Sequence, residues 1–196
     1  MGRPPTYDHD TLLHEIIDCL WERGYAATPV STIVQETGVN AASLYARFGS
    51  KKGLMLAALE MYAKETLEGL EALLASEQPG VPQVRAILEH AMQSFSDPQR
   101  RGCFLVNSIA NISTEMPEFA AAVSGHMERI RALIRDALAE APGLRVSPEE
   151  AALFVQVQVW GIKLLARMEP AEDMGRIVIR QTLNALFTDE AVAAAS

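Results

Sequence analysis

The 196-residue sequence has few of the residues that break or cross-link a chain. Glycine and proline together occupy 22 positions, and cysteine occurs only twice, at Cys19 and Cys103. With 49% apolar and 21% charged residues, the composition excludes a disordered, collagen-like or low-complexity chain. Two cysteines cannot build a disulfide framework, so we expect both to be reduced thiols inside a cell.

Long apolar runs and a secretory signal are also missing. The most apolar stretch, residues 151–160, contains Gln156 and Gln158. It is far shorter than the ~20 residues that a membrane-spanning helix needs. The first six residues, Met-Gly-Arg-Pro-Pro-Thr, lack the apolar segment of a signal peptide. We therefore expect a soluble, cytoplasmic, globular protein with no membrane partner.

The motifs of catalytic and metal sites are absent as well. The four histidines form no His-x-x-x-His or Glu-x-x-His pair that could hold a metal. Neither a Gly-x-Ser-x-Gly elbow nor a phosphate-binding glycine loop occurs. The sequence thus predicts no catalytic site, no metal and no cofactor, and an enzyme is a poor second to a binding protein.

Basic residues are in the minority, with 17 Lys and Arg against 25 Asp and Glu and a formal net charge of −8. A nucleic-acid binder normally shows a basic patch, so the overall charge argues against one. The imbalance is uneven, because residues 1–56 hold five basic and six acidic side chains. Four of the five, Arg3, Arg47, Lys51 and Lys52, stand where a small DNA-binding unit would need them.

Helix-forming residues dominate what is present. Leu, Ala, Glu, Met and Arg prevail, and Val, Ile and Thr are scattered rather than alternating. The fold class is therefore all-α, with about nine helices and a frayed tail over residues 189–196. The expected helices span residues 8–23, 31–37, 41–47, 51–76, 82–96, 100–113, 117–141, 147–168 and 172–187.

Residues 28–52 carry the clearest functional pattern. Two short helices joined by a turn at Gly38 form a helix-turn-helix, with Asn40 as the cap of the second helix. Small side chains along residues 41–47 would let this helix approach a DNA major groove closely. On periodicity alone, an ordinary helical hairpin in a bundle explains the segment equally well.

The same segment resembles the DNA-binding head of the TetR family of bacterial transcriptional regulators. The resemblance lies in Gly38-Val39, Leu44-Tyr45, Arg47-Phe48 and Ser50-Lys51 at the family's spacing, together with the upstream Gly24-Tyr25 and Thr28-x-Val30-x-x-Ile33. It covers residues 8–58 in detail. One departure is Lys52, where the family commonly has Glu, and it adds a positive charge to the DNA side.

The resemblance implies two domains and a function in transcription. Residues 1–50 would form a helix-turn-helix domain that binds a palindromic double-stranded DNA operator. Residues 51–196, with 51–76 as a linking helix, would bind a small-molecule effector that releases the DNA. A homodimer would form through helices 147–168 and 172–187, where one helix is apolar on several sides. A central helix of a monomer is the alternative.

Carried over by position, the resemblance assigns DNA contacts to ten residues. Those nearest the bases would be Asn40, Ala41, Ala42 and Ser43, while Tyr45, Lys51, Thr28, Ser31 and Thr32 would contact phosphates and Arg3 the minor groove. For Arg3, a solvated terminus is an equally good interpretation.

A ligand pocket is expected between helices 82–96, 100–113, 117–141 and 147–168. Methionine and aromatic side chains make adaptable apolar walls, although they are also typical of an ordinary core. The candidate lining residues are Met92, Phe95, Cys103, Phe104, Asn107, Met116, Phe119, Met127, Phe154 and Trp160.

Cys103 has a second possible role. It follows Arg100 and Arg101 and stands at an expected helix start, and both features stabilise a thiolate. Modification of a reactive Cys103 would be an alternative release signal, and a small buried cysteine is the simpler interpretation. Overall, the sequence predicts a dimeric regulator, with repression as the usual mode in the family. A helical adaptor that binds protein instead of DNA is the alternative.

Overall fold

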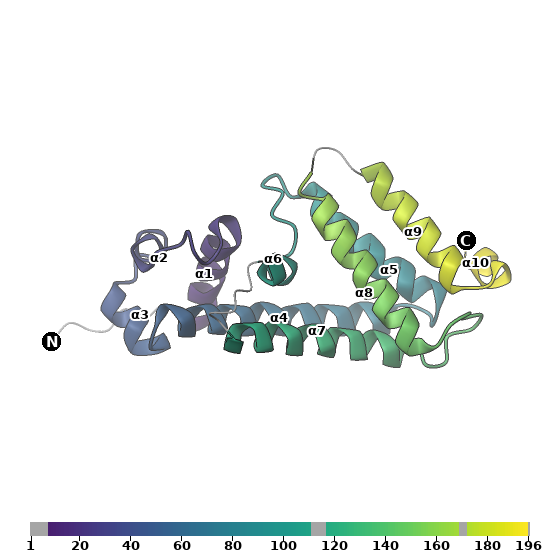
Figure 1. The fold of residues 1–196 in the computed structure, drawn as a ribbon, viewed down its shortest axis with the longest axis horizontal. Coiled ribbons are helices and arrows are strands. Elements are labelled where there is room, and N and C mark those ends of the chain that lie inside the picture. Colours follow the sequence, from purple (N-terminus) through teal and green to yellow (C-terminus); the bar gives the residue numbers. More distant parts are fainter. Residues whose placement is uncertain (1–7, 111–116, 169–171, 196) are drawn as a thin grey trace.

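The structure, a computed structural model, describes residues 8–110, 117–168 and 172–195. Over these residues it contains ten α-helices and one short 3₁₀ helix, and the only β-pairing there is an isolated bridge between Leu144 and Phe187. The molecule is elongated, with α1–α3 at one end and α5, α8 and α9 towards the other (Figure 1). No helix within these ranges is long and apolar enough to cross a membrane.

The first three helices form a compact head. They span His9–Arg23 (α1), Val30–Thr37 (α2) and Ala41–Phe48 (α3). The Asn40 side chain accepts a hydrogen bond from Ser43 N at 2.9 Å, which confirms the predicted cap of α3. Gly38 ends α2 in the left-handed conformation, with φ of 68°, where a glycine is least strained. Ile33, Val39 and Leu44 are buried and hold the two short helices against α1.

A long helix, α4 (Lys51–Ser76), runs from the head to the far end of the molecule, and α7 (Pro117–Ala137) lies alongside it (Figure 1). The Ser50 hydroxyl caps α4 by accepting from Gly53 N. Ala58, Leu59 and Ala63 of α4 are completely buried in one apolar core that also contains residues of α1, α6 (Phe104–Ala110) and α7. The head and the C-terminal part therefore share a continuous core.

The remaining helices pack around a second core. They are α5 (Val81–Met92), the 3₁₀ helix η1 (Gln93–Ser96), α8 (Pro148–Leu165), α9 (Glu172–Leu186) and α10 (Asp189–Ala194). A capping box starts α8, with Ser147 and Glu150 bonding each other's backbone N–H groups. Val84, Leu88, Val155 and Phe187 are buried at the centre of this core.

Three expectations about the helices are corrected. The expected helix 82–96 ends as a 3₁₀ turn, and the expected helix 100–113 begins only at Phe104. Its late start follows from the Asp97 carboxylate, which accepts the backbone N–H groups of Gln99 and Arg101 and closes a turn. The tail expected to be frayed instead forms α10, capped by Thr188, with Val192 packed on the second core.

Candidate functional site

The outer face of α3 is small and exposed. Ala41, Ala42 and Tyr45 are exposed and Ser43 is half-buried, whereas Leu44 points into the core with 1% of its surface accessible. Because two of these side chains are single methyl groups, a flat surface such as a groove edge can approach the helix backbone closely. This face has the shape that the recognition-helix prediction requires.

Two of the predicted DNA contacts have other partners. Thr28 is completely buried, and its hydroxyl donates to Gly24 O at 2.7 Å, so the predicted phosphate contact of this side chain is wrong for this structure. Asn40 uses one lone pair of its side-chain oxygen to cap α3, which leaves its amide nitrogen and the second lone pair for a base. Ser31 is exposed and Thr32 is half-buried near the start of α2. Arg3 lies outside the described residues.

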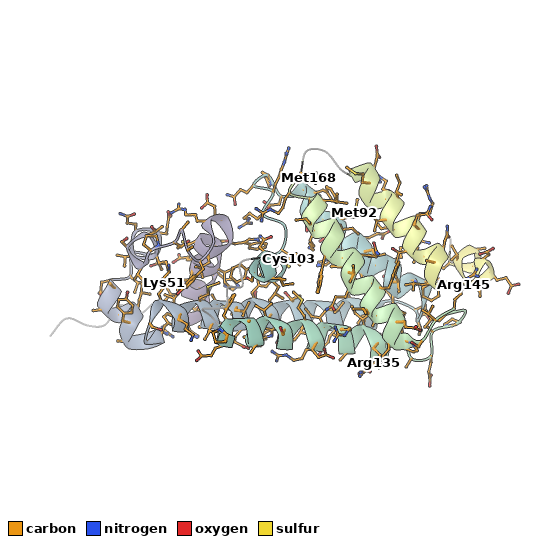
Figure 2. All side chains as sticks on the ribbon, in the orientation of Figure 1. Lys51, Met92, Cys103, Arg135, Arg145 and Met168 are labelled. Carbon is orange, nitrogen blue, oxygen red and sulfur yellow. The ribbon has the colours of Figure 1, made fainter. Side chains whose placement is uncertain are left out.

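Lys51 lies at the junction of the head and α4 (Figure 2). Its ammonium group donates to Tyr25 O at 2.7 Å and stands 4.2 Å from the centre of the Tyr25 ring. Burial lowers the pKa of Lys51 below that of an ordinary lysine. An ammonium group carries three donors, so one bond to the backbone leaves two for a phosphate.

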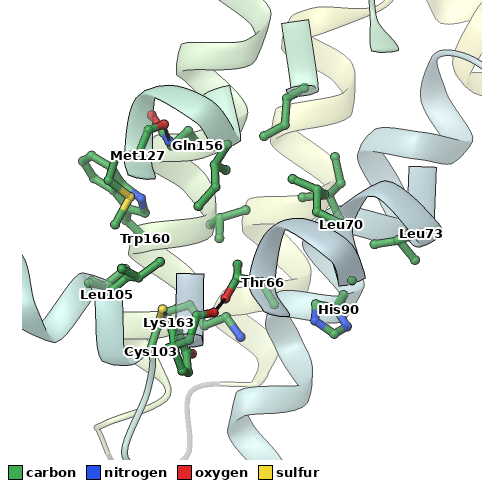
Figure 3. A pocket seen from close by; sticks show the side chains of 18 of the residues that line it. Thr66, Leu70, Leu73, His90, Cys103, Leu105, Met127, Gln156, Trp160 and Lys163 are labelled. Carbon is green, nitrogen blue, oxygen red and sulfur yellow. Dashed lines mark hydrogen bonds between the residues drawn. The ribbon is translucent and has the colours of Figure 1, made fainter. Parts of the chain in front are cut away.

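The C-terminal part contains a cavity of about 310 Å³. Its wall is mostly apolar and comes from α4, α5, α7, α8 and the segment around Cys103 (Figure 3). The contribution of α4, which includes Tyr62, Thr66 and Leu70, is absent from the sequence prediction. The sequence predicts residues 51–76 as a linking helix but carries no information about which partners leave a gap beside it.

Of the predicted lining residues that the structure describes, three lie at this cavity: Cys103, Met127 and Trp160. Phe104 and Phe119 are instead buried in the first core, and the Asn107 amide donates to Arg101 O at 2.7 Å. These are corrections, because apolar periodicity cannot separate a cavity wall from a filled core.

The other four predicted lining residues also lie elsewhere or outside the described ranges. Met92 and Phe95 pack against Gly175 of α9, where the missing side chain leaves them room. Phe154 is 39% exposed on the outside of α8. Met116 lies outside the described residues. The predicted pocket contacts of Met92, Phe95 and Phe154 are therefore wrong.

Cys103 is half-buried at the cavity wall, between the head and the C-terminal helices (Figure 2). The Tyr62 hydroxyl donates to its sulfur at 3.6 Å. Burial and the neighbouring Cys103 raise the pKa of Tyr62 well above its ordinary value, so the phenol stays protonated. Arg101, one of the two arginines predicted to stabilise a Cys103 thiolate, directs its guanidinium to Asp97 and Asp18 instead.

Arg101 connects the cavity wall to the head. Its guanidinium donates to Asp18 of α1 at 2.8 Å and stacks 4.5 Å from the Trp21 ring. Its backbone oxygen accepts a hydrogen bond from Trp21 Nε1 at 3.1 Å. Trp21 in turn packs edge-to-face on Tyr62, with the ring centres 5.2 Å apart. Tyr62, a residue of the cavity wall, thus packs on Trp21 of α1, and Arg101, two residues before Cys103, binds the same helix.

A stripe of apolar side chains is exposed along α8. Leu153, Val157 and Leu164 are between 44% and 59% exposed, and Gly161 lies between them on the same face. Met174 and Ile177 of α9 are likewise exposed. Contiguous exposed apolar surface of this kind is typical of an interaction site.

Comparison with known proteins decides the family. The family described as bacterial regulatory proteins, tetR family, matches residues 12–58, and the tetracyclin repressor-like C-terminal domain matches residues 80–169. The chain belongs to the TetR family.

Individual TetR-family relatives agree with this assignment. The transcriptional repressor ComR of Escherichia coli (strain K12) is 32% identical over 61% of this chain and 58% of its own length. The regulator YezE of Bacillus subtilis (strain 168) is 31% identical over 61% of this chain and 62% of its own. The matched region therefore spans about three fifths of each of these curated relatives.

A solved TetR-family structure matches nearly the whole fold. CifR, as a cysteine mutant complexed with 26-base-pair operator DNA, has a TM-score of 0.84 and 25% identity over 94% of this chain and all of its own. The TetR assignment confirms the resemblance seen in residues 38–51, and the family is one of regulators rather than enzymes. Within the described residues, no three His, Cys, Asp or Glu side chains gather to hold a metal.

Proposed function

We propose that this TetR-family protein is a dimeric transcriptional repressor that binds a palindromic DNA operator and is released by a signal at the cavity. The observation that carries the proposal is the exposed, small-residue face of α3 on a head whose sequence and fold match the family. ComR is named as a repressor, and CifR is bound to operator DNA in its solved structure.

DNA binding is supported by the position of the head at one end of the molecule (Figure 1). The face of α3 with Ala41, Ala42 and Tyr45 would enter the major groove, and the first turn of α2, with Ser31, would lie along a phosphate strand. Lys51 would add a phosphate contact with its two remaining donors. Ser43, which is half-buried, would be the polar side chain of α3 nearest to the bases.

Dimer formation is supported by the exposed stripe on α8 and by its neighbours on α9. A second copy would cover Leu153, Val157 and Leu164, and Gly161 would let the two α8 helices approach closely. A dimer places two α3 helices on one face of a duplex, about one helical turn or 34–36 Å apart, and so explains a palindromic site.

Release is supported by the contacts between the cavity and the head. A ligand that displaces Tyr62 or Cys103, or a group added to the Cys103 thiol, would disturb the packing of Tyr62 on Trp21 and the Arg101–Asp18 pair. Because α1 supports both short helices, a shift there changes the position of α3. A coupling of about 1–3 kcal/mol would lower operator affinity roughly 5–150-fold.

The experiment that tests the proposal is selection of binding sites from a random duplex library by the purified protein. We expect an inverted repeat, bound by one dimer, whose logarithmic affinity falls linearly with the logarithm of salt concentration. Tyr45→Phe, which removes a predicted phosphate contact, should weaken binding to all duplex sequences equally. Ala72→Leu, at an exposed position of α4, is the control and should leave DNA binding unchanged. Failure to enrich any duplex would favour the alternative of a protein-binding adaptor.

A further inference from the structure

One face of α8 presents both polar and apolar groups to the cavity. Gln156, Val159, Trp160 and Lys163 all line it. Their spacing of three, four and seven residues places them on one side of a helix, and two turns separate the first from the last, about 10.5 Å along the axis. Figure 3 shows Gln156 beside Met127 at one end of the cavity and Lys163 beside Cys103 at another.

Gln156 has a buried acceptor without a partner. Only 2% of the residue is exposed, and its amide nitrogen donates to Met127 O at 2.7 Å, which fixes the orientation of the side chain. No described residue donates a hydrogen bond to its Oε1 atom. A buried polar atom left unpaired is destabilising by about 1–3 kcal/mol, so such an atom at a cavity wall indicates a missing donor.

Lys163 supplies the opposite chemistry two turns away. It is partly buried, and none of the ion pairs within the described ranges includes it. Burial lowers the pKa of Lys163, and the nearby Cys103 acts in the opposite direction. An anionic partner stabilises a cation that is partly withdrawn from water in this way. The Tyr62 hydroxyl lies at the same end and donates to the Cys103 sulfur, which is a weak acceptor.

The space between these two groups is apolar. Val159 and Trp160 of α8 face Leu70, Ile87 and other aliphatic side chains from α4 and α5. The remaining ionisable groups of the wall, Glu65 and His90, are exposed, and Glu65 already bonds His14 at 2.8 Å. In the enclosed part of the cavity, Gln156 Oε1 therefore needs a hydrogen-bond donor and Lys163 needs an anion.

We propose that the cavity binds a small, mostly apolar carboxylic acid with a hydroxyl group at its far end. The hydroxyl donates to Gln156 Oε1, the carboxylate meets Lys163 and the Tyr62 hydroxyl, and the apolar middle packs on Trp160. This inference rests on the proposed function, because it specifies the effector of the same regulator.

The test is calorimetric binding to the DNA-free protein with matched ligands that carry no electrophilic double bond and so cannot add covalently to Cys103. The probes are 3-(4-hydroxyphenyl)propanoic acid, 3-phenylpropanoic acid, which lacks the donor, and the methyl ester of the first, which lacks the charge. An 8-hydroxyoctanoic acid and octanoic acid pair repeats the comparison with a flexible chain. We expect each missing group to weaken binding about tenfold.

Variants assign each group to its partner. Gln156→Met, which lacks the acceptor oxygen, should bind the two acids of a pair equally. Lys163→Met should bind the acid and its ester equally. Gln158→Met and Lys64→Met, whose side chains do not line the cavity, should behave like the parent protein.

Each result is a ratio of the dissociation constants of two ligands for the same variant. A general loss of affinity lowers both affinities equally and leaves this ratio unchanged. An unchanged hydroxyl preference in Gln156→Met, or no binding of either hydroxy acid at millimolar concentration, would overturn the assignment. Adding the same ligands to the operator complex separates the two proposals. Binding with the expected ratios but without release of DNA would support the ligand class and contradict the proposed release.

Discussion

The outer face of α3 and the cavity differ in how their residues are brought together. The α3 face comes from eight consecutive residues whose conformation is set locally, by the Asn40 cap and the Gly38 turn. The cavity takes its wall from α4, α5, α7, α8 and the segment near Cys103, which are separated by up to a hundred residues. The α3 face should therefore tolerate distant changes, and the cavity should respond to them.

The largest effect is expected on the α3 face. Ala42→Leu places a branched side chain where the helix must approach DNA, and we expect operator affinity to fall about 100-fold, or about 2.7 kcal/mol. Ala42 is exposed, so the melting temperature should stay within a degree or two of the parent. Fluorescence anisotropy with a labelled operator gives the affinity. Unaltered affinity would place the groove contact on another element.

A smaller effect is expected on the outer stripe of α8. Val157→Glu would bury an unpaired carboxylate between two copies, and we expect the dimer dissociation constant to rise about 10–100-fold. Sedimentation equilibrium measures this constant, with Ser124→Glu on the exposed side of α7 as the matched control. If the Val157→Glu protein remains as tightly dimeric as the control, the interface lies elsewhere.

The smallest effect is expected where the two sites meet. Trp21→Phe keeps an aromatic ring against Tyr62 but removes the hydrogen bond to Arg101 O. We expect the operator affinity of the free protein to change less than threefold, while the ratio of affinities with and without effector changes about fivefold, as for one hydrogen bond. Anisotropy titrations with and without a bound hydroxy acid provide both numbers. Equal ratios in parent and variant would exclude Trp21 from the coupling.

The same difference explains what could be predicted from the sequence. The helix-turn-helix and its caps depend on neighbours within a few residues, so residues 24–51 identify the head directly. Exposure of Ala41, Ala42 and Tyr45 follows from helical periodicity alone. The predicted phosphate contact of Thr28 fails because its side chain turns inwards, onto Gly24 O and Cys19 O at the end of α1, and the spacing of the motif does not show which way this hydroxyl points.

The cavity was harder to predict because it depends on how distant helices fit together. Phe104 and Phe119 are residue types typical of a pocket wall, but they fill the core. Thr66 and Leu70 line the cavity, although the sequence predicts their helix only as a link between the domains. Gln156 and Gln158 stand out equally in an apolar run, and only the fold shows that the first is buried against Met127 while the second is not. Packing, rather than residue type, decides these roles.

Helix α8 faces the cavity with Gln156 and Lys163 and faces outwards with Val157 and Leu164, on adjoining sides of one cylinder. In a two-fold symmetric dimer, the helix that forms a wall of each chamber, the ligand cavity of one copy, would then also form the surface that the other copy contacts. A ligand in one chamber would therefore shift the α8 surface against which the α8 helix of the other chamber packs. The two chambers of a dimer would consequently be filled cooperatively or antagonistically rather than independently, and one bound molecule could alter both heads.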